Sequence, residues 1–354
     1  MAGARHGGAE AFFVRLVVAM QRAAEKFGVE QQVVIRENAE RAAILRATGI
    51  EPVELPFGGL FDLRTSSALK KQITAFKPHI VMTWMNRATD KCPAGTAETD
   101  FIHVGRLGGY YDLKYYQSCD HLIGNTEDIV DYLVDCGWSR QCAHYLPNFV
   151  NEATAAALPR SELFTPQGAP LIFALGRLHK NKAFDVLLAA LSRVPNVYLW
   201  LAGDGPLRRD LEEEARRLGV KPRVRFLGWR DDVAALFAAA DLFVCPSRFE
   251  PLGNVVVEAW AQSRPVVAAD SLGPGTLIHD METGVLAPVD DAPSMARAIE
   301  LVLGDEQLRS HIARQGREAF EAAFTEEAVI EQYMEFFEAV IATREAEKEA
   351  GDAG

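Results

Sequence analysis

The feature that most constrains this chain is a regular alternation of short apolar runs, rich in β-branched residues, with segments long enough to form helices. Six such runs occur in the first 150 residues and six more in the rest of the chain. Strands that alternate with helices form parallel sheets covered by helices on both faces. The 354 residues are enough for two domains of about 150 residues each. The chain is therefore predicted to be an α/β protein with two doubly wound halves.

The predicted strands recur at similar intervals in both halves. They are 32–36, 51–56, 79–84, 100–104, 121–124 and 143–147, followed by 171–175, 197–202, 224–227, 242–245, 265–268 and 285–288. Helices are expected between them, among them 12–27, 66–76, 127–136, 184–192, 206–218, 233–239, 255–262 and 294–303.

Prolines and small residues gather between the two halves, where the strand pattern lapses. A linker is therefore expected over 151–168, between a first domain at 1–150 and a second at 169–325. Of the helices that close the chain, 326–344 is expected to brace the two domains. The charged tail 345–354, rich in Gly and Ala, is expected to fray.

The start of the chain departs from this pattern. Gly7 and Gly8 open the first helix, but only six residues precede them. A doubly wound domain normally has a central strand there, which leads to the ligand-binding edge. Either that first N-terminal strand is absent, or it lies upstream of the given start. A sheet without it exposes unpaired backbone groups, so we expect a compromised N-terminal domain.

Charge and composition exclude several classes of protein. The net charge is −12, without the basic domain or stripe that is usual for a nucleic-acid-binding protein. No apolar run approaches the ~18 residues of a membrane span. The five cysteines form no CxxC pair and are expected to be reduced thiols in a cytoplasmic protein.

Four cations lie on or beside the predicted helix 66–76, and they leave peripheral contact with an anionic membrane surface open. They are Arg64, Lys70, Lys71 and Lys77. Cations on an amphipathic helix are more often simply its solvated face.

One candidate anion site follows the predicted strand 171–175, at the edge where open α/β sheets bind ligands. Arg177 and Lys182 can converge there on one phosphate, arginine through its planar fork and lysine as a point charge. A solvated loop with incidental charges is the alternative.

A second candidate site is the segment 249–258, which carries Glu250 in a loop and Glu258 in the following helix. Gly253 and Asn254 should present free backbone N–H groups at the start of that helix, which suits phosphate oxygens. A carboxylate at Glu258 follows an apolar run and needs hydrogen-bond donors, which a sugar diol would supply. Salt bridges or the helix dipole are the alternatives, but the two glutamates around one helix start favour a functional site.

Two glycine-containing turns complete the pattern. The first, 203–206, begins at Gly203 after a predicted strand, and the second, 226–230, could present backbone groups to a flat base, with Trp229 nearby. Each turn by itself is typical of ordinary turn chemistry.

Five motifs in this half carry a resemblance to a known family. GRLxxxKxxxxLL, LxGxGP, FLGxxxD, PSxxEPxGxxxxEA and GPGxxIxxxxTG follow one another within a stretch from about Leu171 to Val340. In this order they resemble the C-terminal domain of family 4 retaining glycosyltransferases of the GT-B fold (glycosyl transferases group 1), of a bacterial envelope-glycan type. The first half matches more weakly, through 7–10, 124–126 and 147–148.

The resemblance implies two Rossmann-like domains facing across a cleft, and transfer of a hexose-type sugar from a nucleoside-diphosphate sugar. The acceptor would be a glycan or lipid-linked glycan, such as lipopolysaccharide core, at the cytoplasmic face of the inner membrane. The family retains the anomeric configuration of the transferred sugar. No Asp-x-Asp motif and no His/Cys ligand spacing occur, so no metal cofactor is expected. Protein cations and a helix start would instead neutralise the leaving diphosphate.

The resemblance also assigns residues. Arg177 and Lys182 would hold the diphosphate, Glu258 the ribose hydroxyls, and Glu250 would face the transferred sugar as a positioning and charge-stabilising group. The remaining donor contacts would come from Gly7, Gly8, Gly203, Trp229, Arg230, Leu252, Gly253 and Asn254.

The family often places a histidine near the transferred sugar, and His103 is the candidate here. A buried structural histidine is equally open, with Arg106 or Asp112 in the equivalent space. The tyrosine-rich stretch 110–116 would contact the acceptor or pack a helix on the sheet.

Other functions remain open at this point. A sugar-nucleotide epimerase of the same fold fits Glu250 and Glu258 less well, and an inactive sugar-nucleotide-binding protein is suggested by the absent first strand. A nucleotide-dependent dehydrogenase is disfavoured, because Gly7 and Gly8 lack the spaced third glycine and a preceding strand.

Overall fold

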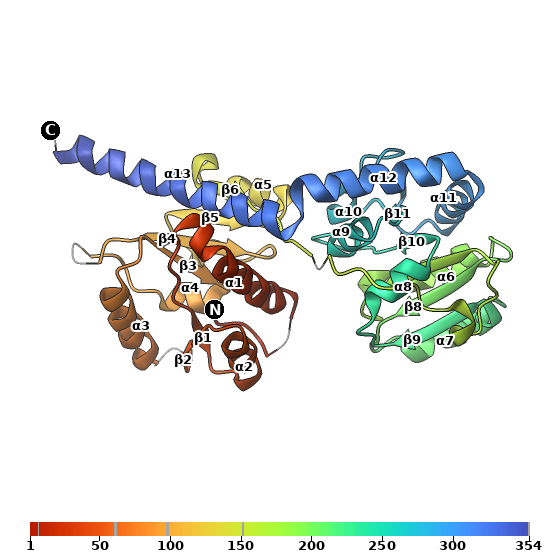
Figure 1. Ribbon diagram of the computed structural model, residues 1–354, viewed down its shortest axis with the longest axis horizontal. Coiled ribbons are helices and arrows are strands. Elements are labelled where there is room, and N and C mark those ends of the chain that lie inside the picture. Colours follow the sequence, from red (N-terminus) through yellow and green to blue (C-terminus); the bar gives the residue numbers. More distant parts are fainter. Residues whose placement is uncertain (6, 60–61, 97–98, 151, 353–354) are drawn as a thin grey trace. The chain divides into compact units, whose positions relative to one another are not determined.

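The computed structural model describes residues 1–5, 7–59, 62–96, 99–150 and 152–352. The chain divides into two compact units, one formed by Met1–Asn148 with Glu326–Gly354 and the other by Phe149–Thr325 (Figure 1). Each unit is an α/β structure with parallel strands.

The first unit contains two parallel sheets. One pairs β1 (Val34–Arg36) with β2 (Val53–Leu55), and the other has the strand order β3-β4-β5-β6. The bounds of this second sheet are β3 (Ile80–Trp84), β4 (Ile102–Leu107), β5 (His121–Gly124) and β6 (Ala143–Tyr145). The helices of the unit are α1 (Gly8–Phe27), α2 (Ala39–Ala47), α3 (Leu63–Phe76), α4 (Asn86–Lys91), α5 (Glu127–Asp135) and α13 (Glu326–Asp352).

Side chains fix several helix starts in this unit. The side chains of Asn38, Asp62 and Thr126 each accept a hydrogen bond from the backbone N–H three residues on. Such caps satisfy one of the donors that a helix start leaves free. The carboxyl end of α1 is capped by Gly28, which adopts the left-handed conformation typical of a helix end (φ 64°).

The second unit is built on one six-stranded parallel sheet with the order β12-β11-β10-β7-β8-β9. Its strands are β7 (Leu171–Leu175), β8 (Tyr198–Ala202), β9 (Val224–Gly228), β10 (Leu242–Cys245), β11 (Val266–Ala269) and β12 (Val285–Ala287). Its helices are α6 (Phe184–Leu191), α7 (Arg208–Arg217), α8 (Val233–Ala239), α9 (Asn254–Ala261), α10 (Leu272–Leu277), α11 (Ala292–Gly304) and α12 (Glu306–Ala323).

Successive residues of the sheet in the second unit alternate between two apolar clusters. Leu199 and Leu201 of β8 belong to one cluster, whereas Trp200 between them belongs to the other. A strand buried on both faces needs apolar residues at consecutive positions, which explains why these strands appear in the sequence as unbroken apolar runs.

Every predicted strand has a counterpart, but β4 begins two residues later than predicted and extends to Leu107. Before it, Thr96 and Thr99 form an antiparallel bridge, and the Asp100 carboxylate pairs with Arg344 and Lys348 of α13. Asp100 therefore belongs to a polar cluster rather than to the strand.

The tail 345–354, expected to fray, is helical as far as Asp352. Lys348 Nζ lies 2.5 Å from Asp100 Oδ2, and Arg344 Nη2 lies 2.8 Å from Asp120 Oδ1. These ion pairs join the last turns of α13 to the ends of the sheet strands in the same unit.

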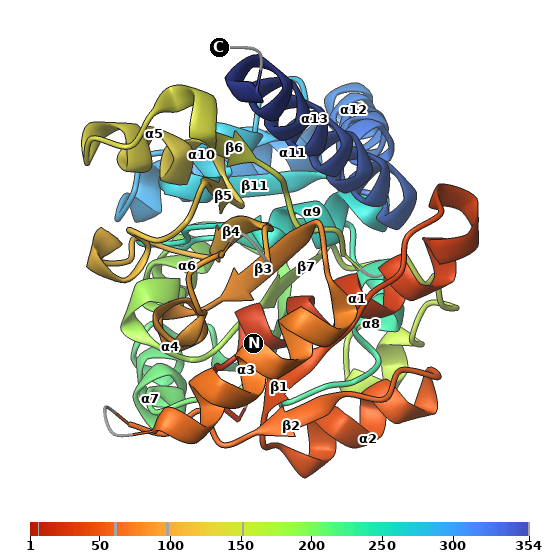
Figure 2. The same cartoon turned by 90° about the vertical axis from the view of Figure 1, so that its left-hand side faces the viewer.

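The amino end of the chain lies between β1 and β3 in both views (Figure 1, Figure 2). The Met1 ammonium donates to Val34 O at 2.9 Å, and Arg36 N donates to Met1 O at 2.9 Å. On the other side, Ala2 N donates to Trp84 O at 3.4 Å. Among the described residues, Met1 and Ala2 are not part of a strand, and β1 and β3 belong to separate sheets.

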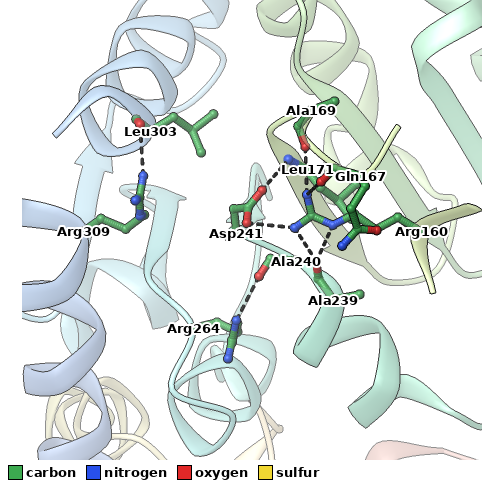
Figure 3. A network of polar contacts seen from close by, with 10 residues as sticks. All are labelled: Arg160, Gln167, Ala169, Leu171, Ala239, Ala240, Asp241, Arg264, Leu303 and Arg309. Atoms are coloured by element: carbon green, nitrogen blue, oxygen red, sulfur yellow. Dashed lines mark hydrogen bonds and ion pairs between the residues drawn. The ribbon is translucent and has the colours of Figure 1, made fainter. Parts of the chain in front are cut away.

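The segment predicted as a linker packs on the second unit. Arg160 donates to Ala239 O and Ala169 O at 2.7 and 2.8 Å, and forms an ion pair with Asp241 at 2.8 Å (Figure 3). The same carboxylate accepts from Leu171 N at the start of β7. Arg160 therefore ties this segment to the amino ends of two central strands.

Among the described residues, no helix combines the length and the apolar character that crossing a membrane requires.

Candidate active site

In the second unit, five loops follow the carboxyl ends of the parallel strands β7 to β11 and therefore share one edge of the sheet. This edge holds all the candidate residues of the second half. The loops comprise residues 176–183, 203–207, 229–232, 246–253 and 270–271.

Backbone hydrogen bonds join the segments that follow β7 and β8. Gly176 N donates to Ala202 O at 3.0 Å, and Leu178 N donates to Asp204 O at 2.9 Å. Gly203 adopts φ +127°, and a Cβ there would overlap the backbone of Gly176. Glycine at this position is required by the close approach of the two loops.

Lys182 and Glu250 meet at this edge. The Lys182 ammonium forms an ion pair with Glu250 Oε2, and the Ser247 hydroxyl donates to the same oxygen at 3.3 Å. The Glu250 residue is only 8% exposed. A buried carboxylate is costly unless it is paired and hydrogen-bonded, and both conditions are met here.

Arg248 joins the two loops that carry this pair, and the sequence analysis did not identify it. Its guanidinium binds the Asp185 carboxylate at 2.9 and 2.6 Å and donates to Lys180 O at 2.9 Å. Burial raises the pKa of Asp185, but the hydrogen bond and the charge of Arg248 outweigh burial and hold this pKa below its usual value. The backbone N–H groups of Arg248 and Phe249 also donate to Asn181 O. The one signal in the sequence was a cation inside the motif that contains Glu250.

The start of α9 lies beside Glu250. Gly253 caps this helix with φ +64°, and a Cβ there would overlap the side chain of Leu277. Gly273 N donates to Glu250 O at 2.8 Å, so the loop after β11 supports the same turn. Leu252, Asn254 and Glu258 are half-buried around this helix start, as expected for groups at a ligand-binding edge.

The remaining donor candidates in this unit are more exposed. Arg177 is exposed, and Trp229 is 79% exposed, with its indole N–H donating to Asp231 Oδ1 at 3.0 Å. Arg230 donates to Asp232 Oδ1 at 2.7 Å through Nε. The structure thus brings together Lys182, Glu250 and the start of α9, whereas Trp229 and Arg230 are held by aspartates of their own turn.

Ser271 is a further candidate that the sequence analysis missed. It lies between β11 and α10, is 6% exposed, and its Oγ has no hydrogen-bond partner among the described residues. A buried hydroxyl without a partner at a ligand-binding edge calls for an explanation, and a bound ligand would provide one.

In the first unit, Gly7 and Gly8 begin α1 around the carboxylate of Glu10. Glu10 is 6% exposed and accepts from Ala4 N at 2.6 Å. A Cβ at Gly7 would overlap this carboxylate, whereas the space around Gly8 is open. At the carboxyl edge of the four-stranded sheet in this unit, Asn125 follows β5. Its buried Oδ1 has no hydrogen-bond partner among the described residues.

His103 does not lie at this edge. It is the second residue of β4, is 3% exposed, and lies near the amino end of the strand. Its Nε2 is 3.0 Å from Thr83 Oγ1 and its Nδ1 is 3.0 Å from Ser118 O. Burial lowers the pKa of His103. This placement favours the structural alternative for His103, because ligands bind at the opposite, carboxyl ends of such strands.

Arg106 lies nearer the carboxyl end of β4, but it too is committed to packing. Its guanidinium donates to Tyr333 Oη at 2.7 Å and to Asn148 Oδ1 at 2.6 Å, and it covers the rings of Phe12 and Trp84. Asp112, the other alternative, is exposed and pairs with Lys114.

Across the described ranges, no cluster of three or more His, Cys, Asp or Glu side chains has the arrangement of a metal site.

Comparisons with known proteins agree with the geometry of the second unit. Residues 169–305 match the family described as glycosyl transferases group 1. Over 338 residues the chain is 38% identical to the lipopolysaccharide core biosynthesis glycosyltransferase LpsE of Rhizobium meliloti, an alignment that covers 94% of this chain and 96% of LpsE. The chain belongs to the group 1 glycosyltransferases. It is a nucleotide-sugar-dependent transferase. This is the family that the five motifs of its second half resemble.

A second curated relative is similarly complete. LpsD of the same organism, also named a lipopolysaccharide core biosynthesis glycosyltransferase, is 32% identical over 345 residues, which cover 96% of this glycosyltransferase and 97% of LpsD. Among solved structures, that of Anabaena HepE in complex with UDP superposes with a TM-score of 0.80 at 19% identity, covering 96% of this chain and 98% of HepE. The fold is therefore GT-B.

Proposed function

We propose that this glycosyltransferase moves a sugar from a uridine diphosphate sugar to a saccharide of the lipopolysaccharide core, with retention at the anomeric carbon and without a metal ion. The observation that carries the donor half of this proposal is the convergence of Lys182, Glu250 and the start of α9 at one sheet edge. LpsE and LpsD are named for lipopolysaccharide core biosynthesis, and HepE was crystallised with UDP and with UDP-glucose.

The cations of the loop after β7 suit the diphosphate. Lys182 is half-buried and Arg177 is exposed, so a phosphate can reach both. The backbone N–H groups at the start of α9 add donors and the positive end of the helix dipole. On departure of the nucleoside diphosphate, these groups neutralise the charge that a divalent metal would otherwise balance.

Glu250 is the group placed for the transferred sugar. One of its oxygens, Oε2, contacts the Lys182 ammonium and the Ser247 hydroxyl, and these contacts fix the orientation of the carboxylate. A fixed negative charge stabilises the positive charge that develops at the anomeric carbon when the bond to the diphosphate breaks. We assign Glu250 this stabilising role in a transfer in which the acceptor enters on the face that the diphosphate leaves.

The acceptor half of the proposal rests on the first unit. The buried Oδ1 of Asn125 accepts no hydrogen bond from the described residues, and an acceptor hydroxyl would donate to it. A Cβ at Gly108 would lie about 4 Å from both the Asn125 amide nitrogen and the Tyr111 hydroxyl, so both polar groups lie close to this glycine. Tyr116, by contrast, is fully buried and bonded to Asn86, which makes it a packing residue.

We also propose that α3 contacts an anionic membrane surface. Arg64, Lys70, Lys71 and Lys77 are all exposed, and the neighbouring Leu63 is 78% exposed. Each basic residue near such a surface contributes about 1 kcal/mol. Co-sedimentation with vesicles that contain anionic lipid should fall when Lys70 and Lys71 are changed to glutamate, and binding that is unaffected by this reversal would count against the contact.

The donor proposal is tested by thermal-shift titration against a panel of nucleoside diphosphates and nucleotide sugars in the presence of EDTA. Selective stabilisation by UDP and one UDP-sugar supports a metal-free uridine site. Stabilisation by another nucleotide alone, or only when a divalent metal replaces EDTA, contradicts it. Turnover with isolated core saccharides as acceptors, followed by NMR of the product anomer, then tests the acceptor and the retention.

A further inference from the structure

A cavity of about 350 Å³ lies at the carboxyl ends of β1 and β3 in the first unit. It is lined by Arg36 at the end of β1, by residues 85–87 around the start of α4, by Tyr111 and by the segment 2–4. Its volume falls within the range of small-molecule sites, ~300–1,000 Å³. The carboxyl ends of parallel strands are also where open α/β sheets bind ligands. The position and the size of this cavity therefore both suit a ligand.

Two arginines give this cavity its charge. The Arg36 side chain is half-buried, and within the described part of the chain it has neither a hydrogen-bond partner nor an ion pair. Arg87 is exposed and donates to Phe57 O at 3.2 Å through Nη1, which uses one of its five N–H donors. The described residues that line the cavity include no Asp or Glu. A half-buried guanidinium without a carboxylate partner favours an anion as the ligand.

The carboxylates closest to this cavity are engaged elsewhere or lie outside it. Glu10 is 6% exposed and accepts from Ala4 N at 2.6 Å. Glu37 and Glu40 line an adjoining cavity of about 430 Å³, which shares Arg36 with the smaller one. In the described lining of the smaller cavity, no carboxylate therefore competes with an anion for the two arginines.

Tyr111 connects this cavity with the groups assigned to the acceptor. Its hydroxyl and the Asn125 amide nitrogen both lie about 4 Å from where a Cβ of Gly108 would be. Burial, followed by the charge of Glu10, raises the pKa of Tyr111, so this hydroxyl remains a hydrogen-bond donor at neutral pH. The two arginines therefore lie beside the part of the first unit to which the acceptor is assigned.

We propose that Arg36 and Arg87 bind an anionic substituent of the acceptor saccharide, either a carboxylate or a phosphate. This inference rests on the proposed function and names the chemical class of its acceptor, an acidic saccharide rather than a neutral one. The planar fork of Arg36 matches two oxygens of either anion, and Arg87 adds a second cation. A saccharide held there and through a hydroxyl on Asn125 Oδ1 is fixed at two points, which restricts the hydroxyls that can reach the donor sugar.

The first test requires no turnover. Phenylglyoxal modifies accessible arginines, and mass spectrometry of peptides follows Arg36 and Arg87 separately. Glucose 6-phosphate and glucuronate should each slow the modification of both arginines several-fold at saturation, whereas glucose should not. Protection by only one of the two acids identifies the substituent as phosphate or as carboxylate. Arg140, an exposed arginine of the same unit, should be modified at one rate throughout.

The second test measures transfer to isolated core saccharides, untreated or neutralised by phosphatase or by reduction of their carboxyl groups. Arg36→Gln should raise KM for the untreated acceptor about tenfold or more, and should change KM for the neutral acceptor and for the donor little. Arg36→Lys should recover part of the loss, because lysine keeps the charge without the fork. Arg140→Gln is the matched control.

The outcomes separate this inference from the proposed function. Transfer to core saccharides with equal KM for acidic and neutral forms, and no protection of Arg36 by either acid, would overturn the inference and leave the proposed function intact. An equal loss for both acceptors in Arg36→Gln would make Arg36 a structural residue and would overturn it as well. Protection without transfer to any core saccharide would support the anion site and overturn the proposed acceptor, and the absence of both would overturn both.

Discussion

Lys182 and Glu250 are 68 residues apart in the chain and form an ion pair at the carboxyl edge of the second unit's sheet. The pair joins a cation suited to phosphate and a carboxylate suited to a developing positive charge. At the proposed donor site, a bound diphosphate would compete with Glu250 for the Lys182 ammonium. The first predictions concern its two members.

Replacing Lys182 by alanine should weaken the binding of UDP by roughly ten- to a hundredfold, since a hydrogen bond to a charged group contributes about 1.5–3 kcal/mol. Binding of UMP should change much less, because Lys182 is assigned to the diphosphate rather than to the nucleoside. Isothermal titration of both nucleotides measures the difference. The matched control is Lys180→Ala, which removes an exposed lysine of the same turn. Equal losses for UDP and UMP would remove Lys182 from the phosphate site.

The two glutamates of the motif should separate binding from turnover. Glu258→Ala should raise the dissociation constant of the nucleotide, because Glu258 is assigned to the ribose hydroxyls. Glu250→Ala should lower kcat by about a hundredfold or more with a smaller effect on nucleotide binding. Steady-state kinetics and titration of each variant give the two quantities, and parallel changes in both would contradict the division of roles.

Arg248 should act as a positioning residue for this pair. Arg248→Ala releases the bonds to Asp185 and Lys180 O, so the turn that carries Lys182 should exchange its amide hydrogens faster and kcat/KM should fall by about tenfold. Arg248→Lys should recover part of the activity, because a lysine keeps the charge but not the planar fork.

A double-mutant cycle distinguishes this role from general destabilisation. If Arg248 and Asp185 act together, Arg248→Ala and Asp185→Ala should lose less in combination than the sum of the two single losses. Additive losses in kcat/KM would mean that the Arg248–Asp185 contact does not position the site.

Much of the fold follows from the sequence because parallel strands carry a local signal. Strands such as β7 and β10 are buried on both faces, so each appears as an apolar run with the bounds that were predicted. The site loops are then located without knowing any contact, since they follow strand ends that share one edge of the sheet. Lys182 and Glu250 were found in this way.

The features that the sequence did not reveal depend on contacts between distant residues. The last turns of α13 are stable because Lys348 and Arg344 pair with Asp100 and Asp120, more than two hundred residues away. Arg248 acquires its role through contacts with distant residues, among them Asp185, Lys180 and Asp290. Likewise, the place of His103 near the amino end of β4 depends on where that strand begins. Strand boundaries are the least reliable part of a prediction from sequence.

The pair of histidines at the start of β5 and β6 should make the stability of the first unit depend on pH. His121 Nδ1 lies 3.0 Å from His144 Nε2, and both rings pack against Phe336 of α13. Burial, followed by the nearby His121 and Arg140, lowers the pKa of His144 to about 4. Burial also lowers the pKa of His121, with Asp120 and Glu347 opposing and Arg344 adding to the shift.

The sign of the effect follows from proton binding. The unfolded chain, in which histidine has a pKa near 6.5, binds more protons than the folded chain between about pH 4 and 6.5. The stability that the neutral pair contributes is therefore complete above about pH 6.5 and is lost as the pH falls towards 4. Because the pair is partly exposed, solvent screening limits the loss to about 1–2 kcal/mol.

Urea unfolding at pH 5 and pH 7 measures this loss in the native chain and in His144→Gln. The variant should be less sensitive to the change of pH, since glutamine keeps a polar side chain without a titrating group. His79→Gln, which changes an exposed histidine of the same unit, serves as the matched variant. An unchanged pH dependence in His144→Gln would show that the protonation of this pair does not limit the stability of the unit.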